Sequence, residues 1–160
     1  MAIPTYQDGD LLLRVYEIRR ETRLREARDF VLGKAAFRDY EDFKKKYPNE
    51  SKGRRHMGMV FTYWDMTCAL VDRGLLNEEL FNACNTEHLF VWFKFRTAIM
   101  GMRQDYEYPA LLSSLEKVSM RHPFAAKMEQ WLAGQDRSRA ARTSPPRRAK
   151  RRAKRKTARA

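Results

Sequence analysis

The stretch MGMVFTYWDMTCALVDRG, residues 57–74, decides how we expect the chain to fold. Its apolar side chains recur every three to four residues, as they do on one face of an α-helix: Met57, Phe61, Trp64, Cys68 and Val71. Val60 and Leu70 flank this stripe, so a helix from about Arg54 to Arg73 would be apolar almost all round. A helix of this kind is usually central in its bundle. Gly74 is a natural C-cap for it.

A second helix with the same character is predicted from about Thr86. Its apolar stripe has the same spacing and consists of Leu89, Trp92, Phe95 or Arg96, Ile99 and Met102. No window of the sequence alternates between apolar and polar residues for long enough to indicate a strand. We therefore predict an all-α fold, an irregular helical bundle of about six helices.

The remaining helices are predicted to be shorter or more exposed. The N-terminal part reads as one long charged helix, capped by Asp8 or Asp10 and ending at Gly33. Short helices are expected within 37–48, where Pro48 ends the pattern, and after Asn77, which is a suitable N-cap. Two more are expected over 109–120, with Pro109 as first helical residue, and over 123–134, closed by Gly134. Together these elements form a predicted helical bundle domain over 5–134.

The positive charge of the chain is concentrated at its C-terminus. The whole sequence has 33 Lys and Arg residues against 20 Asp and Glu. Twelve of the 33 lie from Arg137 onward, where no acidic residue occurs, which leaves 21 basic and 20 acidic residues before that point. The sequence therefore describes a nearly neutral domain joined to a cationic arm. We expect residues 135–160 to be a disordered tail rich in Arg, Lys and Ala, because they lack the apolar residues that build a core.

Nine of these cations lie in the last fourteen residues and are the candidate nucleic-acid-binding residues: Arg147, Arg148, Lys150, Arg151, Arg152, Lys154, Arg155, Lys156 and Arg159. Such an arm neutralises phosphates and releases counterions without reading base sequence. The arginines from Arg19 to Arg28 are a weaker candidate, because acidic residues are interleaved with them. A tail that only improves solubility is the alternative without a binding role.

Catalytic motifs are not found in the sequence. There is no GxSxG, phosphate-binding loop, HExxH or GxGxxG pattern. His56, His88 and His122 lie in unrelated contexts and are expected to be surface or capping residues. We expect no metal and no cofactor, since the two cysteines, Cys68 and Cys84, lack metal-ligand spacing. Both thiols are expected to be buried and reduced.

Asp65 is the one unusual polar residue, because it lies between Trp64 and Met66 on the most apolar predicted helix. A buried carboxylate requires a partner. We expect Asp65 to lie at the helix edge or to form an ion pair with an arginine such as Arg96. The alternative is a catalytic carboxylate with a raised pKa.

Membrane insertion is not indicated by the sequence. The N-terminus lacks the basic region of a signal peptide, and the longest strongly apolar run, Met57 to Trp64, is far shorter than the ~20 residues of a membrane span. We expect a cytoplasmic protein without a transmembrane segment.

The stretch FTYWDMTCALVDRGLLNEELF, residues 61–81, resembles a bacterial family known as domain of unknown function 4760. That family has an aromatic-rich helix, a turn like the one at 72–76 and a short acidic helix. The segment YEIRRETRLREARDFVL, residues 16–32, is similar to the family's charged first helix, and the resemblance extends over roughly 11–120. It implies a helical fold and supplies no established catalytic residues.

Two hypotheses for function follow, with a third held open. The leading one is a non-enzymatic helical protein whose tail binds nucleic acid without sequence specificity, while the helical domain contacts a protein partner or associates with itself. The second is a regulatory or adaptor module of unknown partner, whose tail binds an acidic protein or an anionic membrane surface. The third is an enzyme with a site near Asp65.

Overall fold

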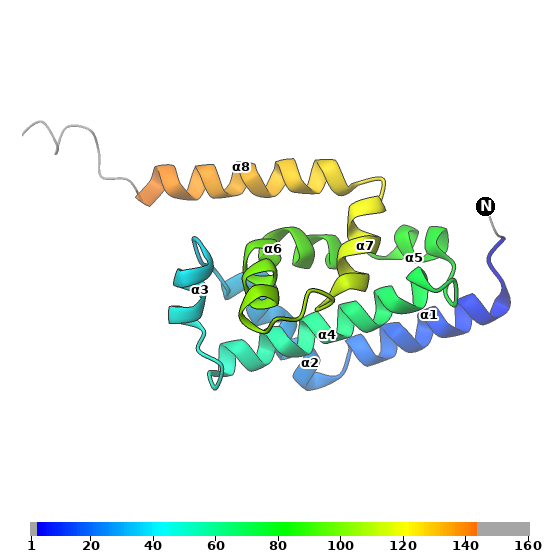
Figure 1. The fold of residues 1–160 in the computed structure, drawn as a ribbon. Coiled ribbons are helices and arrows are strands. Elements are labelled where there is room, and N and C mark those ends of the chain that lie inside the picture. The colour runs from blue at the N-terminus through cyan, green and yellow to red at the C-terminus, as the bar shows by residue number, and fades with distance from the viewer. Residues whose placement is uncertain (1–2, 144–160) are drawn as a thin grey trace, which may run out of the picture. The chain divides into compact units, whose positions relative to one another are not determined.

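Helices account for all the regular secondary structure in the part of the chain described by the structure, a computed structural model (Figure 1). It describes residues 3–143, with side chains as far as Gln135. The helices are α1 (Tyr6–Arg19), α2 (Thr22–Asp29), the π-helical turn η1 (Phe30–Lys34), α3 (Tyr40–Lys46), α4 (Lys52–Asp72), α5 (Glu78–Cys84), α6 (Glu87–Asp105), α7 (Ser113–Arg121) and α8 (Ala125–Thr143). The all-α prediction is confirmed, with eight α-helices over the described residues where about six were expected.

The chain divides into two units, which we describe separately. The first ends at Ala125 and contains α1 to α7, and the second begins at Ala126 and contains nearly all of α8. Within residues 3–143, every helix is too short or too polar to cross a membrane.

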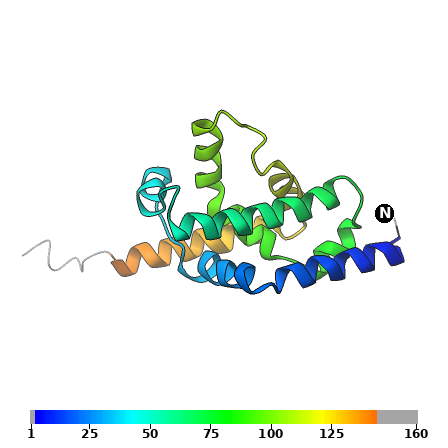
Figure 2. The same ribbon diagram turned by 90° about the horizontal axis from the view of Figure 1, so that it is seen from below.

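The core of the first unit is built by α4 and α6, the two helices predicted to be central. α4 packs against α2 and η1 and also against α7, and Figure 2 shows α1 and α2 running alongside it. The apolar side chains of the two predicted stripes are all at most 5% exposed: Met57, Phe61, Trp64, Cys68, Val71, Leu89, Trp92, Phe95, Ile99 and Met102. These positions were predictable because burial on a helix follows its periodicity.

The predicted long N-terminal helix is interrupted. Thr5, and not Asp8 or Asp10, is its N-cap, and Asp8 completes a capping box as the third helical residue. The chain then breaks after Arg19, and the Glu21 carboxylate caps α2 by accepting the Leu24 N–H at 2.8 Å. The prediction of one helix to Gly33 is therefore wrong.

The start of α7 also differs from the prediction. Pro109 lies in a turn, and the helix begins four residues later at Ser113. Leu112, which precedes the helix, has a left-handed backbone with φ of 56°, and its side chain makes no capping hydrogen bond. Asp65 of α4 supplies the missing acceptor, because its Oδ1 takes the Leu115 N–H at 2.9 Å. The partner of Asp65 is thus a helix terminus and not the expected Arg96.

The other predicted helix ends are mostly confirmed. Gly74 follows α4 with φ of +70°, the left-handed conformation that glycine adopts without strain. The Asn77 side chain accepts the Leu80 N–H at 2.9 Å and caps α5. In the second unit, however, α8 continues through Gly134 to Thr143. Glycine tends to end a helix where the chain turns, but inside one it is merely less favourable than alanine, so the end predicted at Gly134 is wrong.

Candidate functional site

Side chains from α1, α2 and α4 meet at Glu87, the first residue of α6. Arg28 of α2 makes a bidentate ion pair with this carboxylate, with Nε to Oε1 at 2.7 Å. Trp64 of α4 donates its indole N–H to the same oxygen at 3.1 Å. Arg19 of α1 lies 3.7 Å from the carboxylate and donates to Asn85 at 3.2 Å. We call these five residues the Glu87 cluster.

The Glu87 cluster explains the break between α1 and α2. Arg19 and Arg28 are nine residues apart, which on one straight helix places them on opposite faces at 100° per residue. The break after Arg19 allows both guanidinium groups to reach the same carboxylate. The Glu87 side chain is only 12% exposed, and its hydrogen bonds raise the pKa of Arg28. Two members of the suspected arginine face are thus structural, whereas Arg20, Arg23 and Arg25 are exposed.

Two histidines that are far apart in sequence lie together in the first unit. The rings of His88 and His122 are 5.6 Å apart, and His88 also packs against Phe81 at 4.9 Å. His88 is fully buried, and neither of its ring nitrogens has a hydrogen-bond partner among the described residues. His122 accepts the Phe124 N–H through Nδ1 at 2.9 Å. The prediction of unrelated contexts is wrong for this pair, and His56 lies apart against Phe30.

The environment of His88 keeps its ring neutral. Burial, with a smaller contribution from His122, lowers its pKa to about 3. A neutral imidazole could ligate a metal, but among the described residues no third His, Cys, Asp or Glu completes such a group with the pair. The pair was missed because nothing local in the sequence shows that 88 and 122 meet.

The two cysteines differ from each other. Cys68 is buried as predicted, and burial raises the pKa of its thiol well above the usual range. Cys84 is exposed at the end of α5, so its predicted burial is wrong. The periodicity assigned Cys84 to an apolar face, but α5 buries little more than Phe81.

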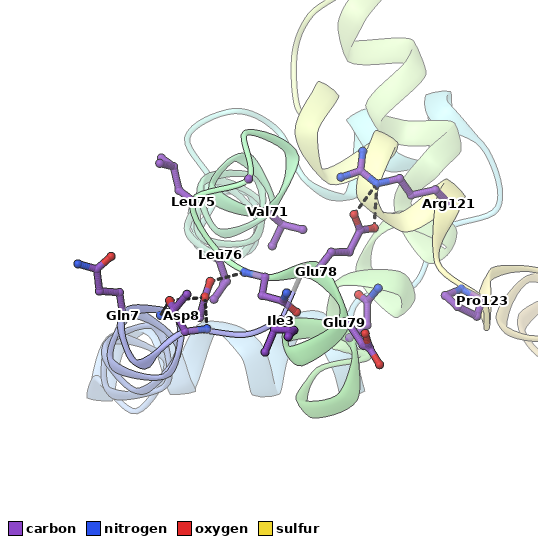
Figure 3. A pocket seen from close by; sticks show the side chains of 14 residues that line it. Ile3, Gln7, Asp8, Val71, Leu75, Leu76, Glu78, Glu79, Arg121 and Pro123 are labelled. Atoms are coloured by element: carbon purple, nitrogen blue, oxygen red, sulfur yellow. Dashed lines mark hydrogen bonds and ion pairs between the residues drawn. The ribbon is translucent and has the colours of Figure 1, made fainter. Parts of the chain in front are cut away.

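A cleft of about 790 Å³ opens between the start of α1, the turn from α4 to α5, and the end of α7 (Figure 3). Its apolar lining comes from Ile3, Val71, Leu75, Leu76 and Pro123. Its charged lining residues are Asp8, Glu78, Glu79 and Arg121. The volume is in the range of sites that bind small molecules.

Most of the charged groups around the cleft already have partners. Hydrogen bonds from the Thr5 hydroxyl and backbone N–H lower the pKa of Asp8, and the Asn77 N–H, which donates to it at 2.6 Å, adds to this effect. Arg121 is bound to Glu78 at 2.8 Å and to Asp72 at 2.6 Å. These contacts fasten the termini of α1, α4, α5 and α7 to one another. The one hydroxyl beside a carboxylate among the described lining residues is Thr5, which donates to Asp8 at 2.6 Å, and this pair is the capping box of α1.

The nine sequence-predicted binding residues cannot be placed beside any of these features. All nine, from Arg147 to Arg159, lie outside the described residues. Asp65, the candidate for an enzyme site, is used to cap α7.

The described residues define an all-helical protein in which several ion pairs join one helix to another. The chain belongs to the family described as Domain of unknown function (DUF4760), whose model matches residues 4–121. The match begins just before α1 and ends with α7, and it confirms the family that the motif at 61–81 indicated. No curated protein and no solved structure matches the chain.

Proposed function

We propose that this protein is a non-enzymatic helical module whose basic C-terminal arm binds nucleic acid without sequence specificity, in the cytoplasm. The observation that carries the proposal is the partition of charge. Twelve Lys and Arg residues without any acidic residue follow Asp136, whereas the rest of the chain is nearly neutral. Closely spaced cations release the counterions condensed on a polyphosphate, which favours binding at low salt.

The ion pairs of the first unit support this assignment of binding to the arm. Arg28 pairs with Glu87, Arg103 with Glu116 at 2.7 Å, and Arg121 with Asp72. Binding of phosphate to these guanidinium groups would require breaking contacts that join helices. The arm lies beyond the residues that match the family model, so its chemistry is separable from the family's fold.

A salt titration tests the proposal. The full-length protein and a chain ending at Thr143, which lacks the nine predicted binding residues, are titrated with duplex DNA and with RNA. If about six to eight cations contact phosphate, log K against log salt has a slope of roughly −5 to −7. Shortening the chain is expected to remove nearly all the binding and to leave the melting temperature unchanged.

Two control chains distinguish the effect of the tail's charge from the effects of chain length and of the order of the tail residues. A full-length chain with the nine cations replaced by Gln should bind as weakly as the shortened one. A chain with the same tail residues in scrambled order should bind like the natural protein, because charge density and not base contact drives the affinity. Absence of binding at low salt would eliminate the proposal. Binding that survives shortening would move the site to cations that the shortened chain retains, either Arg137, Arg139 and Arg142 or the exposed Arg20, Arg23 and Arg25.

The alternative of an adaptor module is favoured by the cleft in the first unit, which has the volume of a ligand site. In that case the arm binds an acidic protein or an anionic membrane surface. Vesicles with and without phosphatidylserine, and polyglutamate as a model acidic chain, are the competing ligands in the same titration. Tighter binding to either than to DNA would favour the adaptor function.

A further inference from the structure

Helix α1 carries apolar residues on two opposite faces. Toward the core, Val15 is 4% exposed and its carbonyl accepts the Tyr63 hydroxyl at 3.0 Å. Away from the core, Tyr6 is 94% exposed, Leu13 65% and Tyr16 52%. A helix that is apolar on both faces is typically covered on both faces.

The exposed residues form one narrow ridge. Tyr6, Gly9, Leu13 and Tyr16 are separated by three, four and three residues, the spacing that forms a seam between two paired helices. We call these four residues the α1 ridge. Scattered exposed apolar residues need no explanation, but a seam spacing of this kind suits a second helix.

Packing among the described residues does not explain why position 9 is a glycine. It lies inside α1, where glycine is less favourable than alanine. A Cβ added there would meet nothing within 4 Å, so neither a turn nor a close neighbour in the same chain requires glycine. A large side chain from another molecule, packed closely against this position, would require it.

We propose that the α1 ridge pairs with the α1 ridge of a second copy of this chain in antiparallel orientation about a two-fold axis. In the antiparallel register that we propose, residues whose numbers add up to about 22 lie opposite each other. Gly9 then faces Leu13 of the partner subunit, and Tyr6 faces Tyr16 of the partner subunit. Each small position then meets a large one, and the aromatic rings meet each other. The two-fold axis generates each of these two pairs a second time, so every residue of the ridge is covered by the partner.

The charges beside the ridge favour a second copy over an unrelated partner. Asp10 and Arg14 lie on the same side of the ridge, and their ion pair at 3.0 Å leaves the side chains 54% and 70% exposed. An antiparallel two-fold brings the same flank of both helices together, as in any isologous interface. In this register Asp10 of each copy lies within one helical turn of Arg14 of the other, so the four charges alternate in sign.

The contact is small, since α1 has 14 residues and is about 21 Å long. Interfaces at the low end of the size range are typically weak and reversible. The expected assembly is therefore a dimer that dissociates in the micromolar range.

Sedimentation of the full-length protein, treated with nuclease to remove bound nucleic acid, tests the association. The natural chain is expected to pass from monomer to dimer between about 1 and 200 µM. Leu13→Glu should be monomeric throughout. Ile18→Glu is the matched control, because Ile18 lies on the same helix at 48% exposure but off the ridge, and it should dimerise normally. A natural chain that stays monomeric, or a Leu13→Glu variant that still dimerises, would overturn the proposal.

Charge exchange tests the identity of the partner. Asp10→Arg leaves four positive charges at the paired flanks, and Arg14→Asp leaves four negative charges, so each variant alone should be monomeric. Mixing the two should restore a heterodimer, because each flank then meets its opposite. Failure of the mixture to associate would exclude the antiparallel register, whatever the nucleic-acid titration shows.

Cross-linking tests the orientation. In a Cys84→Ser background, Gly9→Cys and Leu13→Cys chains are mixed under mild oxidation. The antiparallel register predicts a disulfide between one chain of each kind, in excess over either like pair. Predominance of like pairs would indicate parallel packing and contradict the proposal. Circular dichroism of every variant checks that the helical fold is retained.

Discussion

At the scale of single residues, His88 is a titratable group that the fold removes from water. It is fully buried beside His122 and Phe81, and burial lowers its pKa to about 3. The unfolded chain binds a proton at this position near pH 6.5. Between these two values the unfolded state therefore holds more protons than the folded state.

This difference predicts how stability depends on pH. The free energy of unfolding should fall as pH is lowered from 6.5 toward 3, by at most about 1.4 kcal/mol per pH unit from this group. His88→Leu should reduce the slope measured by urea denaturation between pH 6.5 and 4.5, a window above most carboxyl titrations. Val118→Ala, a change at a buried residue that does not titrate, supplies the control, since it should lower stability at every pH and leave the slope in place. An unchanged slope in His88→Leu would show that the buried ring is not responsible.

The two thiols should differ in reactivity. Cys84 is exposed, whereas Cys68 is buried with a raised pKa, and only the thiolate reacts with alkylating reagents. Native protein treated with iodoacetamide should therefore incorporate one label rapidly, and a second only on addition of denaturant. The Cys84→Ser chain should lose the rapid phase. Rapid labelling of Cys68 in that variant would contradict its burial.

At the scale of helices, the Glu87 cluster joins α1, α2, α4 and α6 through one carboxylate. Removing one member of a buried ion pair leaves the other charge uncompensated. Because the pair is only partly buried, Glu87→Gln should lower the free energy of unfolding by about 1–3 kcal/mol. Glu26→Gln, an exposed change of the same kind on α2, should alter it by less than about 0.5 kcal/mol. Equal effects of the two substitutions in urea denaturation would show that the cluster adds nothing to stability.

The cap of α7 gives a second prediction for a helix. Asp65 accepts the Leu115 N–H, which the helix itself leaves without an acceptor. Asp65→Ala should cost about 1–2 kcal/mol, the range for a lost N-cap, and should speed hydrogen exchange in the first turn of α7. Asp65→Asn retains an acceptor oxygen and should cost less. If Asn and Ala were equally destabilising, the hydrogen bond would not be the cause.

These two features also show which helices the sequence could predict. α4 and α6 were predictable because the spacing of Met57, Trp64, Trp92 and Ile99 reports burial locally. The break after Arg19 and the start of α7 were not, since each depends on a side chain from a distant segment. Neither Glu87 nor Asp65 has a neighbour in sequence that indicates its partner.

At the scale of the whole molecule, the distribution of charge and the family could be predicted from the sequence, whereas the cleft could not. Counting acidic and basic residues located the excess positive charge in the C-terminal segment, and the motif at 61–81 identified the family. The cleft is lined by segments near residues 3–8, 71–82 and 121–123, and their meeting is a property of packing. The nine predicted binding residues lie outside the described residues, so the salt titration is their test.

The cap of α7 comes from Asp65 of another helix, and this affects the order in which the helices fold. An isolated helix of nine residues is too short to persist in water. Its first turn finds an acceptor only after α4 has formed and presents Asp65, and the left-handed backbone at Leu112 adds a local penalty before that contact exists. We therefore expect α7 to form late in folding, after α4. We also expect it to be among the first helices to unfold when the protein is destabilised.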